Sequence, residues 1–125
     1  MATFTVKLKV WNPASPGKSV ELEAWADTGA AYSWISRPRL EPWGVQHVRR
    51  LQFQTIEGHK IERDLAAVFL STEGYTGGDN VVIAEPGDME VLGAHSLESL
   101  GLAVDPVHNK LVPLVVALGL LAREN

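Results

Sequence analysis

The chain has 125 residues, of which 46% are apolar and 21% charged, and this composition predicts one compact domain over residues 1–125. Its formal net charge of −4 argues against a nucleic-acid surface, because binding to phosphates requires a basic patch. The close arginine pairs, Arg37 with Arg39 and Arg49 with Arg50, stand beside acidic residues or proline and favour a solvated loop. The absence of cysteine excludes disulfides, thiolate metal ligands and cysteine nucleophiles.

Neither end of the given sequence has the pattern of a targeting or membrane-spanning segment. The N-terminal stretch MATFTVKLKVW alternates apolar residues with lysine, whereas a signal peptide has a charged head and a continuous apolar run. We therefore expect a cytoplasmic protein. The most apolar run, LVPLVVALGLL (111–121), is too short to cross a bilayer and predicts core or interface.

Alternating hydrophobicity predicts a first hairpin. In TFTVKLKV (3–10), apolar residues alternate with threonine and lysine, which is the period of a half-buried strand. NPASPGKS is a cluster of turn residues, and VELEAWA (20–26) resumes the alternation. The hairpin leads directly to Asp27.

The middle of the chain predicts a second hairpin. RPRLEPWG (37–44) contains two prolines and a glycine and indicates a loop or a bent connection. Strand-like segments at 48–56 and 59–71 flank Glu57 and Gly58, where glycine can supply a positive φ. After them, TEGYTGGDN (72–80) indicates a glycine-rich turn, and VVIA (81–84) a short buried strand.

The C-terminal third predicts one helix and a last hairpin. AHSLESL (94–100) is the only convincing helix, and Gly101 suits its C-cap. LAVD and KLVPLVV bracket the turn PVHN. The fold class expected is therefore all-β with one short helix near the C-terminus.

The stretch AWADTGAAYSWI (24–35) places a carboxylate, Asp27, at the end of an apolar strand. An isolated buried carboxylate is costly, so the group needs a partner or a function. Asp-Thr-Gly alone is ordinary turn chemistry. A second feature gives it weight, because EVLGAHSLESLGLAVDP (90–106) combines an apolar pair, a glycine, a helix and a strand.

Together these segments resemble the retropepsin-like aspartic proteases, a family of viral enzymes and small cellular relatives. AWADTGAAYSWI is similar to the catalytic strand and loop, QTIEGHKI to the flap hairpin, and VLGAHSLESLGL to the apolar pair, glycine and helix. VDPVHNKLVP is similar to the ending of cellular members. The resemblance spans about residues 3–116 and implies a closed β-barrel equivalent to half of a pepsin-like acid protease.

The resemblance also implies the active form and its chemistry. The chain has one Asp-Thr-Gly where pepsin-like enzymes have two, so a homodimer would bring together one Asp27 from each subunit. The two carboxylates would share one proton, activate a water and protonate the scissile carbonyl oxygen. No metal, other cofactor or covalent acyl-enzyme is implied.

Roles for neighbouring residues follow from the same resemblance. Thr28 would fix the geometry of the pair by bonding to the opposite loop, and Gly29 would let the backbone approach substrate. Ala30 lacks the hydroxyl found after this motif in pepsin-like enzymes, which implies a mildly acidic to near-neutral optimum. Ala31 and Ala94 replace an Asp and an Arg that pair in viral members, so no unpaired charge remains, but a carboxylate that helps hold substrate is lost.

The resemblance further implies a cleft for a peptide or protein substrate, with apolar side chains preferred. The substrate-binding residues it implies are Trp25, Ala31, Tyr32, Trp34, Met89 and Val91, with Glu57 and Gly58 at the flap. For Trp25 and Trp34, packing in the core is an equally good interpretation.

Other functions have less support in the sequence. The four histidines share no ligand spacing, and no serine-nucleophile elbow or nucleotide-binding loop is present. The main alternative is a dimeric peptide-binding or scaffold module that retains the fold without proteolysis. A third is an enzyme that matures a single partner. In either case TFTVKLKV and LVPLVVAL are expected to build the dimer, with LLAREN as a tail or an added interface element.

Overall fold

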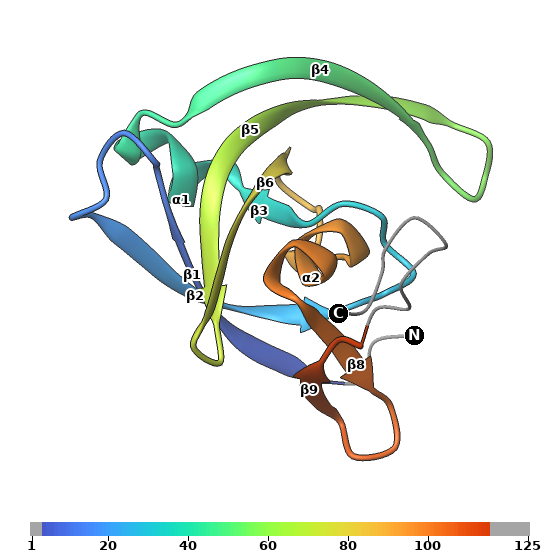
Figure 1. Ribbon diagram of the computed structural model, residues 1–125. Helices are drawn as coiled ribbons and strands as arrows, with labels where there is room; N and C mark the ends of the chain where they lie inside the picture. The colour runs from blue at the N-terminus through green and yellow to red at the C-terminus, as the bar shows by residue number, and fades with distance from the viewer. Residues whose placement is uncertain (1–3, 116–125) are drawn as a thin grey trace, which may run out of the picture.

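The computed structural model describes residues 4–115, and its strands form a closed barrel (Figure 1). Six strands pair in the order β1-β2-β7-β3-β6-β5, and pairing of β1 with β5 closes the ring, with β4 attached to β5. The strands are β1 (Thr5–Trp11), β2 (Ser19–Ala26), β3 (Trp34–Ser36), β4 (Gln46–Gln54), β5 (Lys60–Thr72), β6 (Tyr75–Ala84), β7 (Val91–Leu92), β8 (Leu102–Asp105) and β9 (Lys110–Pro113). The expected all-β class is confirmed.

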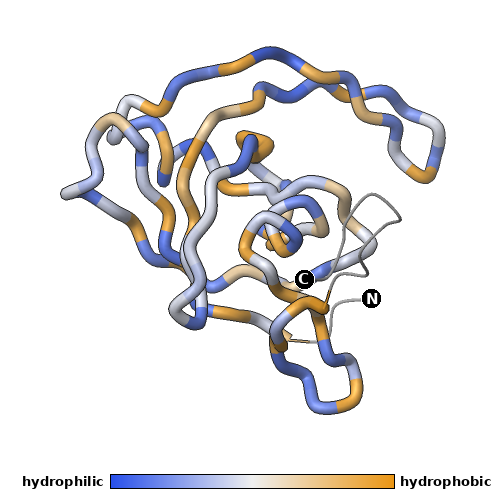
Figure 2. The backbone as a smooth tube through the Cα atoms, viewed as in Figure 1, coloured by the Kyte–Doolittle hydropathy of each residue, from blue (hydrophilic) through white to orange (hydrophobic). Residues whose placement is uncertain are grey.

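The first hairpin is formed as the alternating pattern predicts. β1 and β2 pair antiparallel with Leu8 opposite Leu22, and Val6, Leu8 and Val10 are buried while the intervening lysines are exposed. Figure 2 shows the polar and apolar residues that alternate along this hairpin. The apolar faces of both strands join one core cluster with β5, β6 and α2 (Ala94–Leu100).

The second hairpin extends beyond the barrel as a curved arm (Figure 1). β4 and β5 pair antiparallel from Gln54 opposite Lys60 back to Gln46 opposite Ala67. Its turn contains Gly58 at a φ of 88°, which the sequence anticipates. The last hairpin, β8–β9, is also formed where it is expected.

Only the start of the glycine-rich segment 72–80 is a turn, which corrects the sequence prediction of a turn over the whole segment. β6 begins at Tyr75, and the turn consists of Glu73 and Gly74, both with positive φ. Gly77 and Gly78 lie within the strand, where packing requires them. A Cβ at Gly77 would lie 2.8 Å from the Ser99 carbonyl oxygen, and one at Gly78 would lie 2.8 Å from the Phe69 ring.

The connection at 37–44 is more regular than expected. It forms a short helix, α1 (Arg37–Leu40), followed by a 3₁₀ turn, η1 (Glu41–Trp43). Pro38 is compatible with a first helical turn, where its missing N–H has no intrahelical partner. The predicted helix at 94–100 is confirmed as α2, and Gly101 ends it at a φ of 74°.

The start of α2 crosses the loop that follows β2 at very short range. A Cβ on Gly93 would lie 2.4 Å from the Tyr32 carbonyl oxygen and 2.8 Å from that of Ala30. Directly after it, the backbone N–H of Ala94 donates to the Ala30 carbonyl at 2.8 Å, and that of His95 donates to Ala31 at 2.9 Å. Only glycine therefore fits at position 93.

A buried chain of hydrogen bonds fixes the same crossing from inside. The hydroxyl oxygen of Ser33 accepts from the Gly93 N–H at 2.9 Å, and the two hydroxyls of Ser33 and Ser96 lie 2.6 Å apart. The Ser96 hydroxyl in turn donates to the Asp79 carboxylate at 2.7 Å. Both serines are fully buried, so each needs these partners.

No helix within residues 4–115 is long and apolar enough to cross a membrane. Part of the expected first strand, and residues 116–125 including LLAREN, lie outside the described residues. The role predicted for those segments in a dimer therefore stays a prediction.

Replacing Gly93 with alanine tests the crossing. The added methyl group overlaps backbone atoms that cannot move independently, so Gly93→Ala should lower the free energy of unfolding by about 1–3 kcal/mol or prevent folding. Gly17→Ala is the matched control, because no atom lies within 4 Å of its added Cβ. Equal stability of the two variants, measured by urea unfolding, would contradict the packing argument.

Candidate active site

Asp27 follows the last residue of β2 and is held by the backbone on both sides. Its N–H donates to the Leu92 carbonyl of β7 at 3.0 Å, and its carbonyl accepts from the Ala30 N–H at 3.2 Å. Its side-chain Oδ1 accepts from the Gly29 N–H at 2.9 Å. The main chain therefore fixes the carboxylate at the start of a tight turn.

The carboxylate is half-buried in the single chain, not buried as the sequence suggested. Thr28, Gly29 and Ala31 are exposed beside it. Within residues 4–115, no cation lies within ion-pair distance of Asp27. Asp27 therefore lies next to small, exposed residues of its loop, and this part of the loop is accessible to a second molecule.

Aromatic side chains join the loop after Asp27 to the β4–β5 arm. The Phe53 ring, from β4, lies 5.2 Å from the Trp34 ring and 6.1 Å from that of Tyr32. Tyr32 also contacts His95 of α2, with ring centroids 5.0 Å apart. The sequence reasoning missed Phe53 and His95, because nothing in the local pattern of either segment indicates a partner so distant in sequence.

A cavity of about 260 Å³ lies beside this aromatic cluster, lined by Trp34, Asp88, Met89 and Val91. Val91 lies on β7 between β2 and β3, where it pairs with Trp25 of β2 and with Trp34 of β3. The residue after it, Leu92, accepts the hydrogen bond from Asp27. The cavity and the carboxylate therefore share one structural support.

Three of the four lining residues are among those predicted for substrate binding, and Asp88 is new. Trp25 is 40% exposed and Met89 is 62% exposed, so neither is a core side chain. Trp34 is half-buried, and Tyr32 lies on the same loop. Glu57 and Gly58 are exposed at the tip of the arm and do not line the cavity.

Asp88 is held by a two-pronged ion pair from the arm. Arg63 of β5 donates through Nε to Oδ2 at 2.7 Å and through an Nη to Oδ1 at 3.0 Å, and the backbone N–H of Glu85 donates to Oδ2 at 2.8 Å. These bonds, that from Arg63 above all, lower the pKa of Asp88 below its ordinary value. The segment 85–90 is thereby tied to the arm.

Two further arginines hold the other carboxylates of that segment. Arg37 donates to Glu85, with Nε at 3.1 Å from Oε1, and Arg39 donates to Glu90 at 2.8 Å. The bond from Arg37 lowers the pKa of Glu85, while burial would raise that of Glu90 but is outweighed by bonds from Arg39 and Ser36. The solvated loop predicted for Arg37 and Arg39 is therefore wrong.

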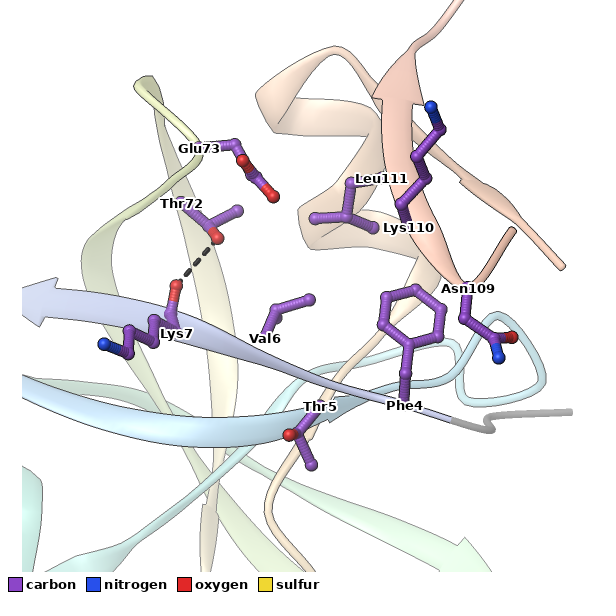
Figure 3. Close-up of a pocket in the computed structure, with 9 residues that line it drawn as sticks. All are labelled: Phe4, Thr5, Val6, Lys7, Thr72, Glu73, Asn109, Lys110 and Leu111. Atoms are coloured by element: carbon purple, nitrogen blue, oxygen red, sulfur yellow. Dashed lines mark hydrogen bonds between the residues drawn. The ribbon is translucent and has the colours of Figure 1, made fainter.

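A second cavity has a volume of about 330 Å³ (Figure 3). It opens between β1, the end of β5 and the β8–β9 hairpin, with Phe4, Val6 and Leu111 converging at its centre. At its edge the Thr72 hydroxyl donates to the Lys7 carbonyl at 2.7 Å, where pairing of β1 with β5 ends. None of the predicted site residues lines it.

Acid should weaken the fold through the carboxylates of segment 85–90. The pKa values of Glu85, Asp88 and Glu90 are lowered on folding, so their contribution is complete above their ordinary values, 4.5 for Glu and 3.8 for Asp. It is lost as the pH falls through the lowered values. The free energy of unfolding should therefore decline below about pH 4.5.

Urea unfolding between about pH 7 and pH 3 measures this decline. Glu85→Gln should flatten the acid limb of the curve, because the variant has one titrating partner fewer. Glu57→Gln is the control, since Glu57 is exposed at the tip of the arm. Parallel curves for the wild type and Glu85→Gln would refute the assignment.

Comparison with known proteins supports the fold. No protein-family model and no curated protein matches the sequence. Among solved structures, the chain is similar to the protease of simian foamy virus (mac), with 18% sequence identity and a TM-score of 0.55. The match covers 76% of this chain and 92% of the viral protease. The molecule therefore has the fold of a retroviral protease.

Proposed function

We propose that the protein is an aspartic endopeptidase that is active as a homodimer, with one Asp27 from each subunit. The observation that carries the proposal is the position of Asp27-Thr28-Gly29. This turn follows the end of β2, is bonded to β7 and crosses the start of α2, within a fold similar to that of a viral protease. No cofactor is part of the proposed reaction.

A dimer would supply what the single chain lacks. Hydrolysis by acid–base catalysis needs one group to accept a proton from water and another to donate one to the carbonyl oxygen. The chain contributes one such carboxylate at this turn, and it stands half-buried beside exposed Thr28 and Gly29. A second copy related by a two-fold axis would place its own Asp27 opposite the first.

Proximity would then set the protonation of the pair. Two like charges a few ångströms apart cannot both ionise near neutral pH, so the pair holds one proton and titrates in two steps. The ionised carboxylate accepts a proton from the attacking water, and the protonated one donates to the scissile carbonyl oxygen. The proposed role of Thr28 is to fix the two loops against each other.

The lining of the 260 Å³ cavity supports an apolar side chain in the substrate. Trp34, Met89 and Val91 offer a ring face, a flexible thioether and a branched aliphatic group. Trp25 is partly exposed next to Val91 and extends this apolar surface. The arm would cover an extended peptide, with Glu57 and Gly58 at its tip. The proposed compartment is the cytoplasm.

The alternative is a dimeric peptide-binding module without catalysis. The absence of an acidic side chain at Ala31 favours it, because that position has no carboxylate to hold a substrate backbone. An enzyme that matures one partner protein is a third possibility, and it would cleave few general peptides. Direct measurement of cleavage separates these functions.

Replacing the proposed catalytic carboxylate should abolish cleavage. In a peptide library assayed by mass spectrometry from about pH 4 to 7.5, the wild type should cleave next to apolar residues. Asp27→Asn should reduce the rate by at least about 10²–10⁴-fold, because an amide cannot accept the proton. Glu21→Gln is the control, because it removes an exposed carboxylate of β2 that lies outside the turn. Undiminished cleavage by Asp27→Asn would rule out the proposed mechanism.

Mixing experiments test whether both subunits contribute a carboxylate. At constant total protein, an equal mixture of wild type and Asp27→Asn that has exchanged subunits should keep about one quarter of the activity, since only wild-type pairs have both groups. Independent monomers would keep about one half. The oligomeric state of each protein, measured by sedimentation, is the control for exchange.

A further inference from the structure

The 260 Å³ cavity next to the aromatic cluster combines three apolar residues with one carboxylate. Trp34, Met89 and Val91 provide the apolar lining, and Asp88 is the acidic member. A bare carboxylate in such a wall would attract a lysine or arginine side chain and disfavour an aliphatic one. Whether Asp88 is neutralised therefore decides which class of side chain the cavity accepts.

Arg63 of β5 neutralises the charge of Asp88. The guanidinium and the carboxylate form two hydrogen bonds, at 2.7 and 3.0 Å, which is the planar geometry that gives a strong pair. Each side chain is 17% exposed, so water screens the pair only partly. Arg63 does not itself line the cavity, whereas its partner Asp88 does.

The other ion pairs of segment 85–90 do not have this position. Arg37 holds Glu85 and Arg39 holds Glu90, but neither carboxylate lines the cavity. Both of these arginines lie in α1, whereas Arg63 lies in β5 of the arm. The charge of the cavity wall is therefore set by a residue of the hairpin that would cover the substrate.

We propose that Arg63 is a specificity-determining residue, which keeps the cavity selective for apolar side chains by cancelling the charge of Asp88. The inference rests on the proposed peptidase function and names the class of side chain that this site takes. Removing the guanidinium leaves Asp88 with the backbone N–H of Glu85 as its hydrogen-bond donor. The cavity then becomes a site for a cationic side chain.

The test compares matched peptides on the wild type and two variants. A peptide cleaved by the wild type is resynthesised with each apolar residue near the cleaved bond changed in turn to lysine. At the substrate position whose side chain binds in the cavity, Arg63→Met should shift the ratio of kcat/KM for the lysine peptide over the apolar peptide by about tenfold toward lysine. The double variant Arg63→Met with Asp88→Asn should restore the apolar preference.

Arg39→Met is the control variant, because it removes the arginine partner of Glu90 on the same segment without changing a residue that lines the cavity. It should leave the ratio as in the wild type. An unchanged ratio in folded Arg63→Met, or a shift that persists in the double variant, would overturn the inference.

Binding separates this inference from the proposed function. Pairs of library peptides that differ only by an apolar residue or a lysine at one position are used, and their affinities for Asp27→Asn forms of each protein are measured by fluorescence anisotropy, where no cleavage is expected. If the wild type cleaves no peptide but Arg63→Met still gains affinity for the lysine peptide, the peptidase proposal fails and the role of Arg63 stands. If the wild type cleaves peptides but Arg63→Met changes the preference in neither assay, the peptidase proposal stands and the role of Arg63 fails.

Discussion

The fold depends on the close crossing between the turn after β2 and the start of α2. Gly93 allows two backbones to approach within a distance that no side chain permits, and the next two N–H groups bond to the carbonyls of Ala30 and Ala31. Since Asp27 is bonded to Leu92 just before the crossing, the same contact fixes the carboxylate. The backbone contacts around Gly93 therefore hold both the packing of α2 and the position of the Asp27 carboxylate.

The barrel and the wall of the candidate site are stabilised by different kinds of interaction. The barrel is closed by apolar side chains and by pairing of β1 with β5, which makes a rigid frame. The wall of the site is held instead by arginine–carboxylate pairs from α1 and the arm. Such pairs fix orientation more than they stabilise, because desolvation offsets much of their attraction.

The division explains how the arm could influence the site. Phe53 of β4 contacts Trp34 and Tyr32, and Arg63 of β5 holds Asp88, so both strands of the arm touch the elements that line the cavity. A movement of the arm would change the aromatic contacts and the charge of the wall together. In the proposed dimer, this couples recognition of a side chain to the covering of the peptide.

The alternating strands, the α2 helix with Gly101, and the turn that presents Asp27 follow from the amino-acid sequence, because they depend on local periodicity and backbone conformation. Residues 75–80 were wrongly predicted as a turn, since Gly77 and Gly78 are required by contacts with Ser99 and Phe69 and not by a turn. The pairing of Arg63 with Asp88 and the position of Phe53 depend on how the chain folds in three dimensions. These contacts join residues that lie far apart along the chain, and no local pattern encodes the distance between them.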